Sequence, residues 1–243
     1  MKTATALLAT FGLLASAAAL GADVSATITG TTDYDFRGVS QTEDDPAIQG
    51  DVSLSTDQGF YAGLWASNVA FDNCCDESYE LDWYGGFTVG ETVEWDAGGV
   101  YYSYPGADDL DYYEFYLGAT YYGEDENWDL GVKQWFTPDW FGYEEYGYYS
   151  EINASYTLPW WDIGVTGHYG YTWGDGPKNN TDDSGLDEYG DWSIGLTKSL
   201  WHLDFDLRWV DTDLDGDLKV DSGAGTNDSR AIFSVSTTFP WES

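Results

Sequence analysis

Residues 163–173, which read IGVTGHYGYTW, decide the fold. Between Ile163 and Trp173, large apolar side chains and Gly167 occupy every second position, and glycine, threonine or histidine stands between them. Successive side chains of a strand point to opposite faces, so a period of two predicts a β-strand with one apolar and one polar face. The same alternation runs through most of the chain after residue 23, as in residues 203–209.

About twelve segments follow this period, each roughly 9–13 residues long, as a strand that crosses a bilayer requires. No helical stretch competes with them. The strands are predicted to begin near Val24, Ala47, Phe60, Tyr79, Val93, Tyr112, Trp128, Tyr148, Trp161, Tyr189, Leu203 and Arg230. The sequence therefore predicts an all-β protein, a closed antiparallel transmembrane β-barrel of about 12 strands.

The connections between these strands alternate strictly between short and long. The short ones are residues 56–59, 90–92, 123–126, 159–160 and 199–201, and the long ones are 38–46, 72–78, 104–111, 137–147, 174–188 and 212–229. Outer-membrane barrels show this asymmetry, with short periplasmic turns and longer extracellular loops. A soluble sandwich has no physical reason to sort its loops in this way.

The composition favours a barrel and excludes other classes. The 243 residues are 42% hydrophobic and 18% aromatic, so a net charge of −36 does not imply disorder. Only 8 Lys and Arg stand against 44 Asp and Glu, which excludes a nucleic-acid binder, because phosphate binding needs clustered basic residues. We expect no cofactor.

The direction in which each face points depends on the solvent. In a membrane barrel the apolar faces contact lipid and the polar faces line a lumen, whereas in a soluble barrel the faces are inverted. Aromatic residues crowd the predicted strand ends, where amphipathic rings favour the lipid headgroup region, and this favours the membrane barrel. These residues are Tyr101, Tyr102, Tyr104, Tyr112, Tyr113, Tyr121, Tyr122, Trp160 and Trp161.

The N-terminal segment is predicted to lie outside the barrel. Lys2 is followed by an uncharged stretch rich in Ala and Leu, and small residues then follow at a spacing typical of signal-peptide cleavage. We expect residues 1–22 to form a signal peptide cleaved between Ala19 and Ala22, and residues 23–243 to form the barrel domain. The expected location is the outer membrane of a Gram-negative bacterium.

Several stretches of the chain form a recognisable pattern. Residues 24–69 include DYDFRGVSQ (33–41), DPAIQG (45–50) and GFYAGLWASNV (59–69), and ELDWYGG (80–86) and VDTD (210–213) follow. In these stretches, and most specifically in residues 24–69, the chain resembles the TorF family of bacterial outer-membrane porins. The resemblance implies an outer-membrane barrel whose last strand ends in an aromatic residue read by the barrel assembly machinery. Phe239 and Trp241 both remain candidates for that residue. Outer-membrane lipid, and lipopolysaccharide through bridging cations, are further expected partners.

Charged residues on the polar faces are predicted to line the lumen. They are Asp33, Asp35, Arg37, Glu80, Asp82, Glu94, Asp96, Glu114, Asp129, Lys133, Glu151, Asp162, His168, Asp204, Asp206 and Arg208. The excess of carboxylates predicts a porin-like channel for passive diffusion of small solutes that prefers cations. Because twelve strands make a narrow barrel, a closed or plugged barrel with a structural or surface-binding role is the alternative.

Asp33, Asp35 and Arg37 are expected on one face of the first strand, about 6.5–7 Å apart. One hypothesis is an internal charge ladder near the pore mouth. The other is an ion-paired strut that holds the first strand in register and avoids an unpaired buried charge.

Two further motifs have weak chemical signals. Asp211, Asp213, Asp215 and Asp217 resemble the first half of a calcium loop, but the twelfth position is Ser222 instead of an acid. Cys74 and Cys75 are adjacent in a predicted external loop, where they could form a vicinal disulfide.

Catalytic machinery is not evident in the sequence. There is no G-x-S-x-G motif, and neither His168 nor His202 has a serine and an acid at a recognisable spacing. We therefore expect the protein not to be an enzyme. A serine hydroxyl within hydrogen-bond reach of either histidine would revive that possibility.

Overall fold

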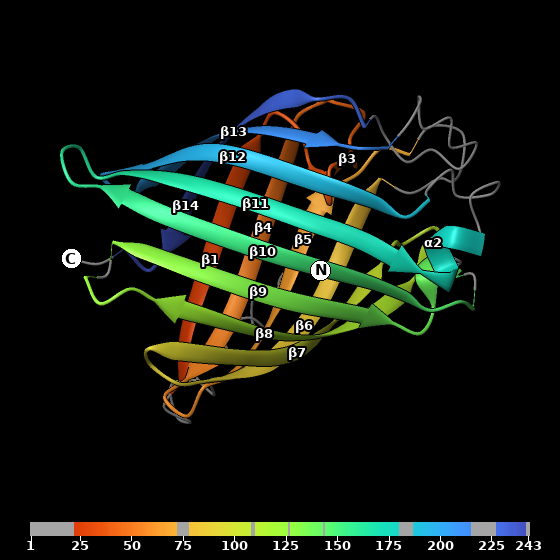
Figure 1. The fold of residues 1–243 in the computed structure, drawn as a ribbon, viewed down its shortest axis with the longest axis horizontal. Helices are drawn as coiled ribbons and strands as arrows, with labels where there is room; N and C mark the ends of the chain where they lie inside the picture. The colour runs from red at the N-terminus through yellow and green to blue at the C-terminus, as the bar shows by residue number, and fades with distance from the viewer. Residues whose placement is uncertain are drawn as a thin grey trace, which may run out of the picture.

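The computed structural model describes residues 22–71, 78–107, 110–125, 127–142, 144–179, 187–214 and 227–241. They form a closed barrel of twelve antiparallel strands, and the predicted fold class is confirmed (Figure 1). Each strand pairs with its neighbour in sequence, and the barrel closes where β1 pairs with both β4 and β14. The strands are β1 (Ala22–Thr31), β4 (Ala47–Thr56), β5 (Phe60–Asn68), β6 (Tyr79–Val89), β7 (Val93–Ser103), β8 (Tyr112–Tyr122), β9 (Trp128–Thr137), β10 (Gly147–Leu158), β11 (Ile163–Gly174), β12 (Tyr189–Leu200), β13 (Leu203–Thr212) and β14 (Arg230–Phe239).

The apolar faces of the strands point outward. Ile48 and Ile194 are 74% and 56% exposed, whereas Glu80 and Glu114 are each 2% exposed. A barrel stable in water would show the reverse pattern, because exposure of apolar area to water is unfavourable. The choice between the two orientations is therefore settled in favour of a polar interior.

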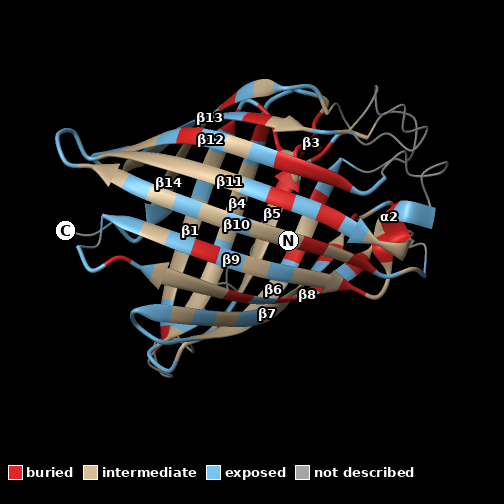
Figure 2. Cartoon of the chain, in the orientation of Figure 1, coloured by how far each residue is buried: buried red, intermediate tan, exposed pale blue. Residues whose placement is uncertain are grey.

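The short and long connections are sorted to opposite ends of the barrel, as the alternation predicted (Figure 1). Buried residues gather toward the long-connection end, on the right of the view in Figure 2. Three apolar clusters lie there: Val39, Trp140 and Tyr189; Tyr102, Tyr104, Ala107 and Tyr112; and Tyr34, Ala47 and Val69. This end of the lumen is therefore the more densely filled.

Two of the long connections contain short helical segments, a 3-10 turn at Trp140–Gly142 and α2 (Asp175–Asn179). In the described parts of the chain, no helix has the length and apolar character that a bilayer crossing demands.

Two expectations about strand ends are wrong. The strand predicted to begin near Trp161 begins at Ile163, because residues 159–162 form a tight turn in which Asp162 has a φ of 47°. Among the strand-end aromatics, Tyr102, Tyr104 and Tyr112 lie inside the barrel instead of facing outward. Tyr101, Tyr113, Trp160 and Trp161, which belong to the same predicted set, are exposed.

The first strand is shorter than its sequence pattern predicts. β1 ends at Thr31, where the Thr31 hydroxyl donates to the carbonyl oxygen of Asp33 and the chain turns away from the barrel wall. Residues 32–46, termed the inward segment below, contain two short paired strands, β2 (Asp35–Phe36) and β3 (Val39–Ser40).

Candidate functional site

The inward segment enters the barrel. Arg37 contacts β8 through Glu114, and Arg230 of β14 binds Asp33 and Asp35. β8 and β14 stand on different sides of the ring of strands, so a segment that touches both must cross the lumen. The lumen is therefore narrowed by the chain itself near the end with the long connections.

The tip of the inward segment requires a glycine. Gly38 has a φ of 84°, and a Cβ added there would lie 2.2 Å from Cγ2 of Thr212 on β13. Arg37 also adopts a positive φ of 53°, which a non-glycine residue rarely does. This tight, left-handed tip directs the Arg37 side chain away from β12 and β13.

Asp33 organises the inward segment. One of its carboxylate oxygens accepts hydrogen bonds from the hydroxyls of Ser40 (2.5 Å) and Thr42 (3.0 Å). Its other oxygen accepts from Nε of Arg230 at 2.5 Å, and Nη2 of Arg230 reaches Asp35 at 2.6 Å. Arg230 lies beside the end of β1 in the folded barrel, although 197 residues separate it from Asp33 in the sequence. It was not among the predicted site residues. Sequence spacing carries no signal for a contact of this kind.

Arg37 and Glu114 form a buried, bidentate ion pair. The distances are 2.6 Å and 3.0 Å, and the side chains are 7% and 2% exposed. Tyr102 donates a further hydrogen bond to Glu114 at 3.0 Å. The guanidinium carbon lies 4.2 Å from the ring centroid of Tyr149. The expectation that Arg37 shares a strand face with Asp33 and Asp35 is wrong, because the three residues follow the end of β1; Arg37 forms a strut between the inward segment and β8.

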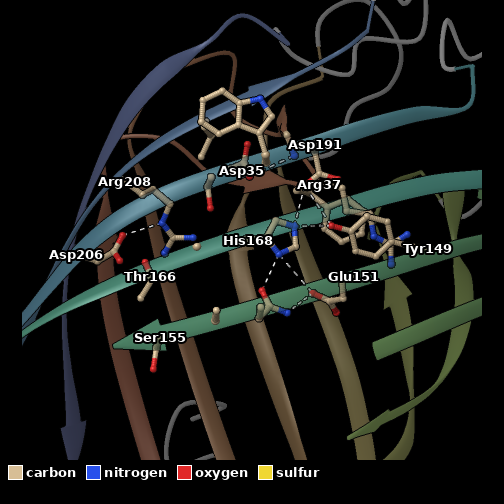
Figure 3. Close-up of a pocket in the computed structure, with 18 of the residues that line it drawn as sticks. Asp35, Arg37, Tyr149, Glu151, Ser155, Thr166, His168, Asp191, Asp206 and Arg208 are labelled. Atoms are coloured by element: carbon tan, nitrogen blue, oxygen red, sulfur yellow. Dashed lines mark hydrogen bonds and ion pairs between the residues drawn. The ribbon is translucent and has the colours of Figure 1, made fainter. Parts of the chain in front are cut away.

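A cavity of about 480 Å³ lies beside the inward segment (Figure 3). Some of the residues that line this cavity were predicted to face the lumen, and others were not. The predicted ones are Asp35, Arg37, Asp129, Glu151, His168, Asp206 and Arg208, and the missed ones include Trp135, Tyr149, Asn153 and Asp191. The alternation within β12 could have found Asp191, which shares a face with the buried Tyr189.

His168 occupies the centre of this wall (Figure 3). Its Nε2 lies 2.9 Å from Asp191 and 2.8 Å from the Tyr149 hydroxyl, and its Nδ1 lies 2.7 Å from Oδ1 of Asn153. Both ring nitrogens therefore face oxygen acceptors. The second oxygen of Asp191 is buried and has no hydrogen-bond partner.

A second cavity of about 400 Å³ continues toward the short-turn end. Asp204, Asp206 and Arg208 line it, together with hydroxyl residues such as Thr29 and Ser234. Asp206 and Arg208 also line the first cavity, so the two spaces adjoin along β13. Nε of Arg208 donates to Asp206 at 2.7 Å.

Other predicted lumen residues form a network on the opposite wall. Lys133 binds Asp96 at 2.9 Å, and Asp96 also accepts from the hydroxyl of Tyr61 at 2.6 Å. The hydroxyl of Tyr122 donates to Glu94 at 3.2 Å near the short-turn end. Tyr61 was not among the predicted lumen residues. Its ring packs over Gly86 of β6, where a Cβ would collide with the ring.

Glu80 and Asp82 lie inside the barrel but line neither cavity. They are 2% and 8% exposed, and Tyr104 donates to Glu80 at 2.8 Å. The second oxygen of Glu80 and one oxygen of Asp82 have no hydrogen-bond partner. These two acids are therefore part of the packed end of the lumen.

Asp162 is not a lumen residue. It lies in the turn between β10 and β11, and its side chain is 91% exposed. The prediction extended the alternation of β11 two residues too far toward the N-terminus, and the parity rule has no meaning in a turn.

Most residues of the two weaker motifs, and the predicted signal peptide, are not covered by the structure, so these predictions stay predictions. Cys74, Cys75, Asp215, Asp217 and residues 1–21 lie outside the described residues. Asp211 and Asp213 are described, but within the described ranges no group of three or more acidic, His or Cys side chains is placed to hold a metal.

Neither histidine forms a hydrogen bond with a serine hydroxyl among the described residues. His202 stacks on Trp241, with ring centroids 4.9 Å apart, at the short-turn end. The absence of enzymatic activity stays a prediction.

The barrel resembles solved outer-membrane channels. The KdgM porin aligns with a TM-score of 0.57 at 10% identity, over 90% of this chain and 99% of that chain. The NanC porin gives 0.56 at 9% identity, over 89% and 100%, and an outer membrane channel from Pseudomonas putida F1 gives 0.52 at 15% identity, over 90% and 96%. At such identities the likeness shows a shared fold. No curated protein matches the chain.

A family match covers the barrel from before β1 to the last residue of β14. Residues 15–239 match the family described as "Bacterial protein of unknown function (Gcw_chp)". Because the match spans well over half of the sequence, the chain belongs to the Gcw_chp family.

Proposed function

We propose that the protein is an outer-membrane channel of a Gram-negative bacterium, through which small solutes diffuse passively and which prefers cations. The observation that carries this proposal is a barrel with an apolar exterior and two adjoining polar cavities inside. The fold shared with the KdgM and NanC porins and the resemblance to the TorF family support it.

The apolar exterior supports a location in lipid. Large side chains such as Ile48, Trp83 and Leu117 are more than half exposed on the outer face. In water, an exposed apolar surface of this extent would promote aggregation. In a bilayer, the same surface contacts the lipid acyl chains.

The charge of the cavity walls supports a preference for cations. The carboxylates are Asp35, Asp129, Glu151, Asp191, Asp204 and Asp206, and the bases are Arg37, Lys198 and Arg208. Arg37 is neutralised by Glu114 and Asp35 by Arg230, and both partners lie outside the cavity lining, so four unshared carboxylates and Asp206, which pairs with Arg208, face Lys198 and Arg208. Carboxylates in a confined lumen create a negative potential that concentrates cations and repels anions.

The comparison with KdgM sharpens this expectation. A KdgM porin structure contains disordered oligogalacturonate, which is a polyanion. The acidic cavity walls of the present barrel predict the opposite charge preference, so the shared fold does not imply a shared solute.

Reversal potentials in planar bilayers test the proposal. Across a KCl gradient we expect the parent to prefer K⁺. The triple change Asp129→Asn, Asp204→Asn and Asp206→Asn should lower the K⁺/Cl⁻ permeability ratio by roughly tenfold at low salt, the lower end of the effect of a charged cleft.

A matched control removes three carboxylates outside the cavities. Asp57→Asn, Glu91→Gln and Asp162→Asn alter exposed residues in short turns, and we expect them to leave the permeability ratio close to that of the parent. Anion preference in the parent, or an equal loss in both triple variants, would contradict the assigned role of the cavity acids.

The second candidate function is a closed barrel with a structural or surface-binding role. The inward segment favours it, because buried ion pairs to β8 and β14 hold that segment across the lumen. The same bilayer recordings discriminate, since a closed barrel gives no unitary currents although the protein inserts.

We expect mild acidification to lower the conductance. Burial raises the pKa of Asp35 to about 6; Arg230 opposes this shift, whereas Asp191 and Asp33 add to it. A raised pKa in the folded state means that the docked inward segment is most stable at low pH and loses stability as the pH rises through about 6. Conductance should therefore fall from pH 7 to pH 5.

The Asp35→Asn variant isolates this effect. It should lose most of the conductance change between pH 7 and pH 5, whereas Asp162→Asn should keep it. An increase in parent conductance on acidification would instead indicate that loss of the Arg230–Asp35 ion pair dominates.

A further inference from the structure

The ring of His168 is held in a fixed set of hydrogen bonds on the wall of the cavity beside the inward segment (Figure 3). Its Nδ1 lies 2.7 Å from Oδ1 of Asn153, and its Nε2 lies 2.9 Å from Oδ1 of Asp191. A neutral imidazole has one donor and one acceptor nitrogen, whereas an imidazolium has two donors. The charge of the ring therefore follows from what each of these two oxygens can bond.

The amide of Asn153 has a fixed orientation. Its Nδ2 donates to one oxygen of Glu151 at 2.9 Å. The reverse orientation would place the amide oxygen against a carboxylate oxygen, and neither of them carries a proton. Glu151 is itself held in place, because its other oxygen accepts from Nε1 of Trp135 at 2.7 Å. The oxygen of Asn153 therefore faces His168, and Nδ1 of the ring must carry the proton of their hydrogen bond.

Asp191 requires a proton on the other ring nitrogen. Its side chain is 4% exposed, one of its oxygens has no hydrogen-bond partner, and the other accepts from the hydroxyl of Tyr149 at 3.2 Å. A ring without a proton on Nε2 would bring a nitrogen lone pair within 2.9 Å of that carboxylate oxygen. A proton between the two groups resides on the ring, because an imidazolium is a much weaker acid than a carboxylic acid.

The charges around His168 stabilise a positive ring. Glu151 on β10 and Asp191 on β12 approach it, and in the described parts of the chain neither acid lies within ion-pair distance of a Lys or Arg. The other charged or titratable groups of this cavity wall come from the inward segment, β7, β9 and β13; they are Asp35, Arg37, Tyr102, Asp129, Asp206 and Arg208. Both arginines are already paired with a carboxylate. The ring is therefore surrounded by an excess of negative charge.

We propose that His168 is an imidazolium at neutral pH and that its charge limits how strongly the channel prefers cations. The ring is 21% exposed and lies beside the narrowed part of the lumen, where it offsets one of the carboxylates that attract cations. A histidine loses its charge without leaving its place, so this residue also makes the selectivity depend on pH. The role in selectivity rests on the proposed channel function, whereas the charge of the ring does not.

Nitrogen NMR of the protein in detergent tests the charge. The sequence contains 2 histidines, so His202→Gln leaves His168 as the single labelled ring. An imidazolium gives two similar nitrogen shifts, whereas the two nitrogens of a neutral ring resonate far apart. At about pH 8, where a histidine of ordinary pKa is neutral, we expect two similar shifts. Asp191→Asn replaces the carboxylate by an amide that can donate or accept, and should give a neutral ring at the same pH.

Reversal potentials test the role in selectivity. His168→Gln removes the charge and keeps a polar side chain. At neutral pH and low salt it should raise the K⁺/Cl⁻ permeability ratio by about twofold, since one charge is removed instead of three. Raising the pH until the imidazolium signal is lost should bring the parent to the same ratio and leave the variant unchanged.

The matched control is Lys178→Gln. Lys178 of α2 is exposed and lines neither cavity, so loss of its equal charge should leave the permeability ratio of the parent. Retained folding of each variant is checked by heat-dependent electrophoretic mobility.

The outcomes separate the two proposals. A neutral ring in the protein with His168 as its single histidine would overturn the assigned charge. An imidazolium whose removal leaves the permeability ratio unchanged would overturn its role in selectivity. An imidazolium in a barrel without unitary currents would contradict the channel and the role in selectivity, but support the assigned charge. Cation-selective currents together with a neutral ring would leave the channel in place and refute the proposal for His168.

Discussion

Removing the inward segment is expected to raise the single-channel conductance more than any other change considered. The variant replaces residues 33–45 with a short Gly/Ser linker between β1 and β4. Tyr34, Val39, Ser40 and Thr42 are buried inside the barrel, so their removal opens the end of the lumen that is most densely filled. For a narrow barrel we expect an increase of at least about threefold in 1 M KCl.

The control for this deletion lies at the other end of the barrel. Asp57→Ser with Gln58→Ser changes the exposed turn between β4 and β5, and should leave the conductance unchanged. Equal conductance of parent and deletion variant would show that another part of the barrel sets the constriction.

The second large effect is expected from breaking the Arg37–Glu114 pair on one side only. Glu114→Gln leaves the Arg37 guanidinium buried without its counter-charge, and such losses cost about 3–5 kcal/mol. We expect this variant to release the inward segment and to lower the free energy of unfolding of the barrel in detergent. Urea titration monitored by tryptophan fluorescence measures the change.

A double-mutant cycle identifies the cause. Arg37→Met combined with Glu114→Met removes both charges, and should recover most of the stability that Glu114→Gln loses, because no unpaired charge remains. Additive losses in the double variant would show that the two side chains act independently, which would contradict a strut.

The strand arrangement was predictable because it depends on local alternation. A period of two identifies strands, and the lengths of the connections identify the two ends of the barrel. The same signal misled at the end of β1. Tyr34 and Phe36 alternate with Asp33 and Asp35 as strand residues do, yet this segment packs inside the lumen. A segment that packs inside a lumen lined by aromatic and acidic residues shows the same alternation of apolar and polar side chains as a strand with one face toward lipid and the other toward the lumen.

The candidate site was predictable only in part, since parity assigns a side chain to the interior but not to a partner. Glu114 and Glu151 were expected inside, and both are there. That Glu114 meets Arg37 depends on the path of the inward segment across the lumen, and that Glu151 meets Trp135 depends on the register between the neighbouring strands β9 and β10. The separation of Asp33 from Arg230 by 197 residues illustrates the limit of sequence spacing.

The contacts of Arg230 also have a consequence for the order of assembly. β1 meets β14 over six residue pairs, against ten with β4, and this short seam is the one that closes the ring. Asp33 and Asp35 lie just after the end of β1, on one side of this seam. Arg230, the first residue of β14, lies on the other side of the seam and binds both. Contacts so distant in sequence form late. The Arg230 contacts therefore hold the inward segment only after β1 and β14 have paired. The lumen is narrowed in this way only in the completed barrel. An assembly intermediate in which β1 and β14 are still apart lacks the ion pairs between Arg230 and the two aspartates.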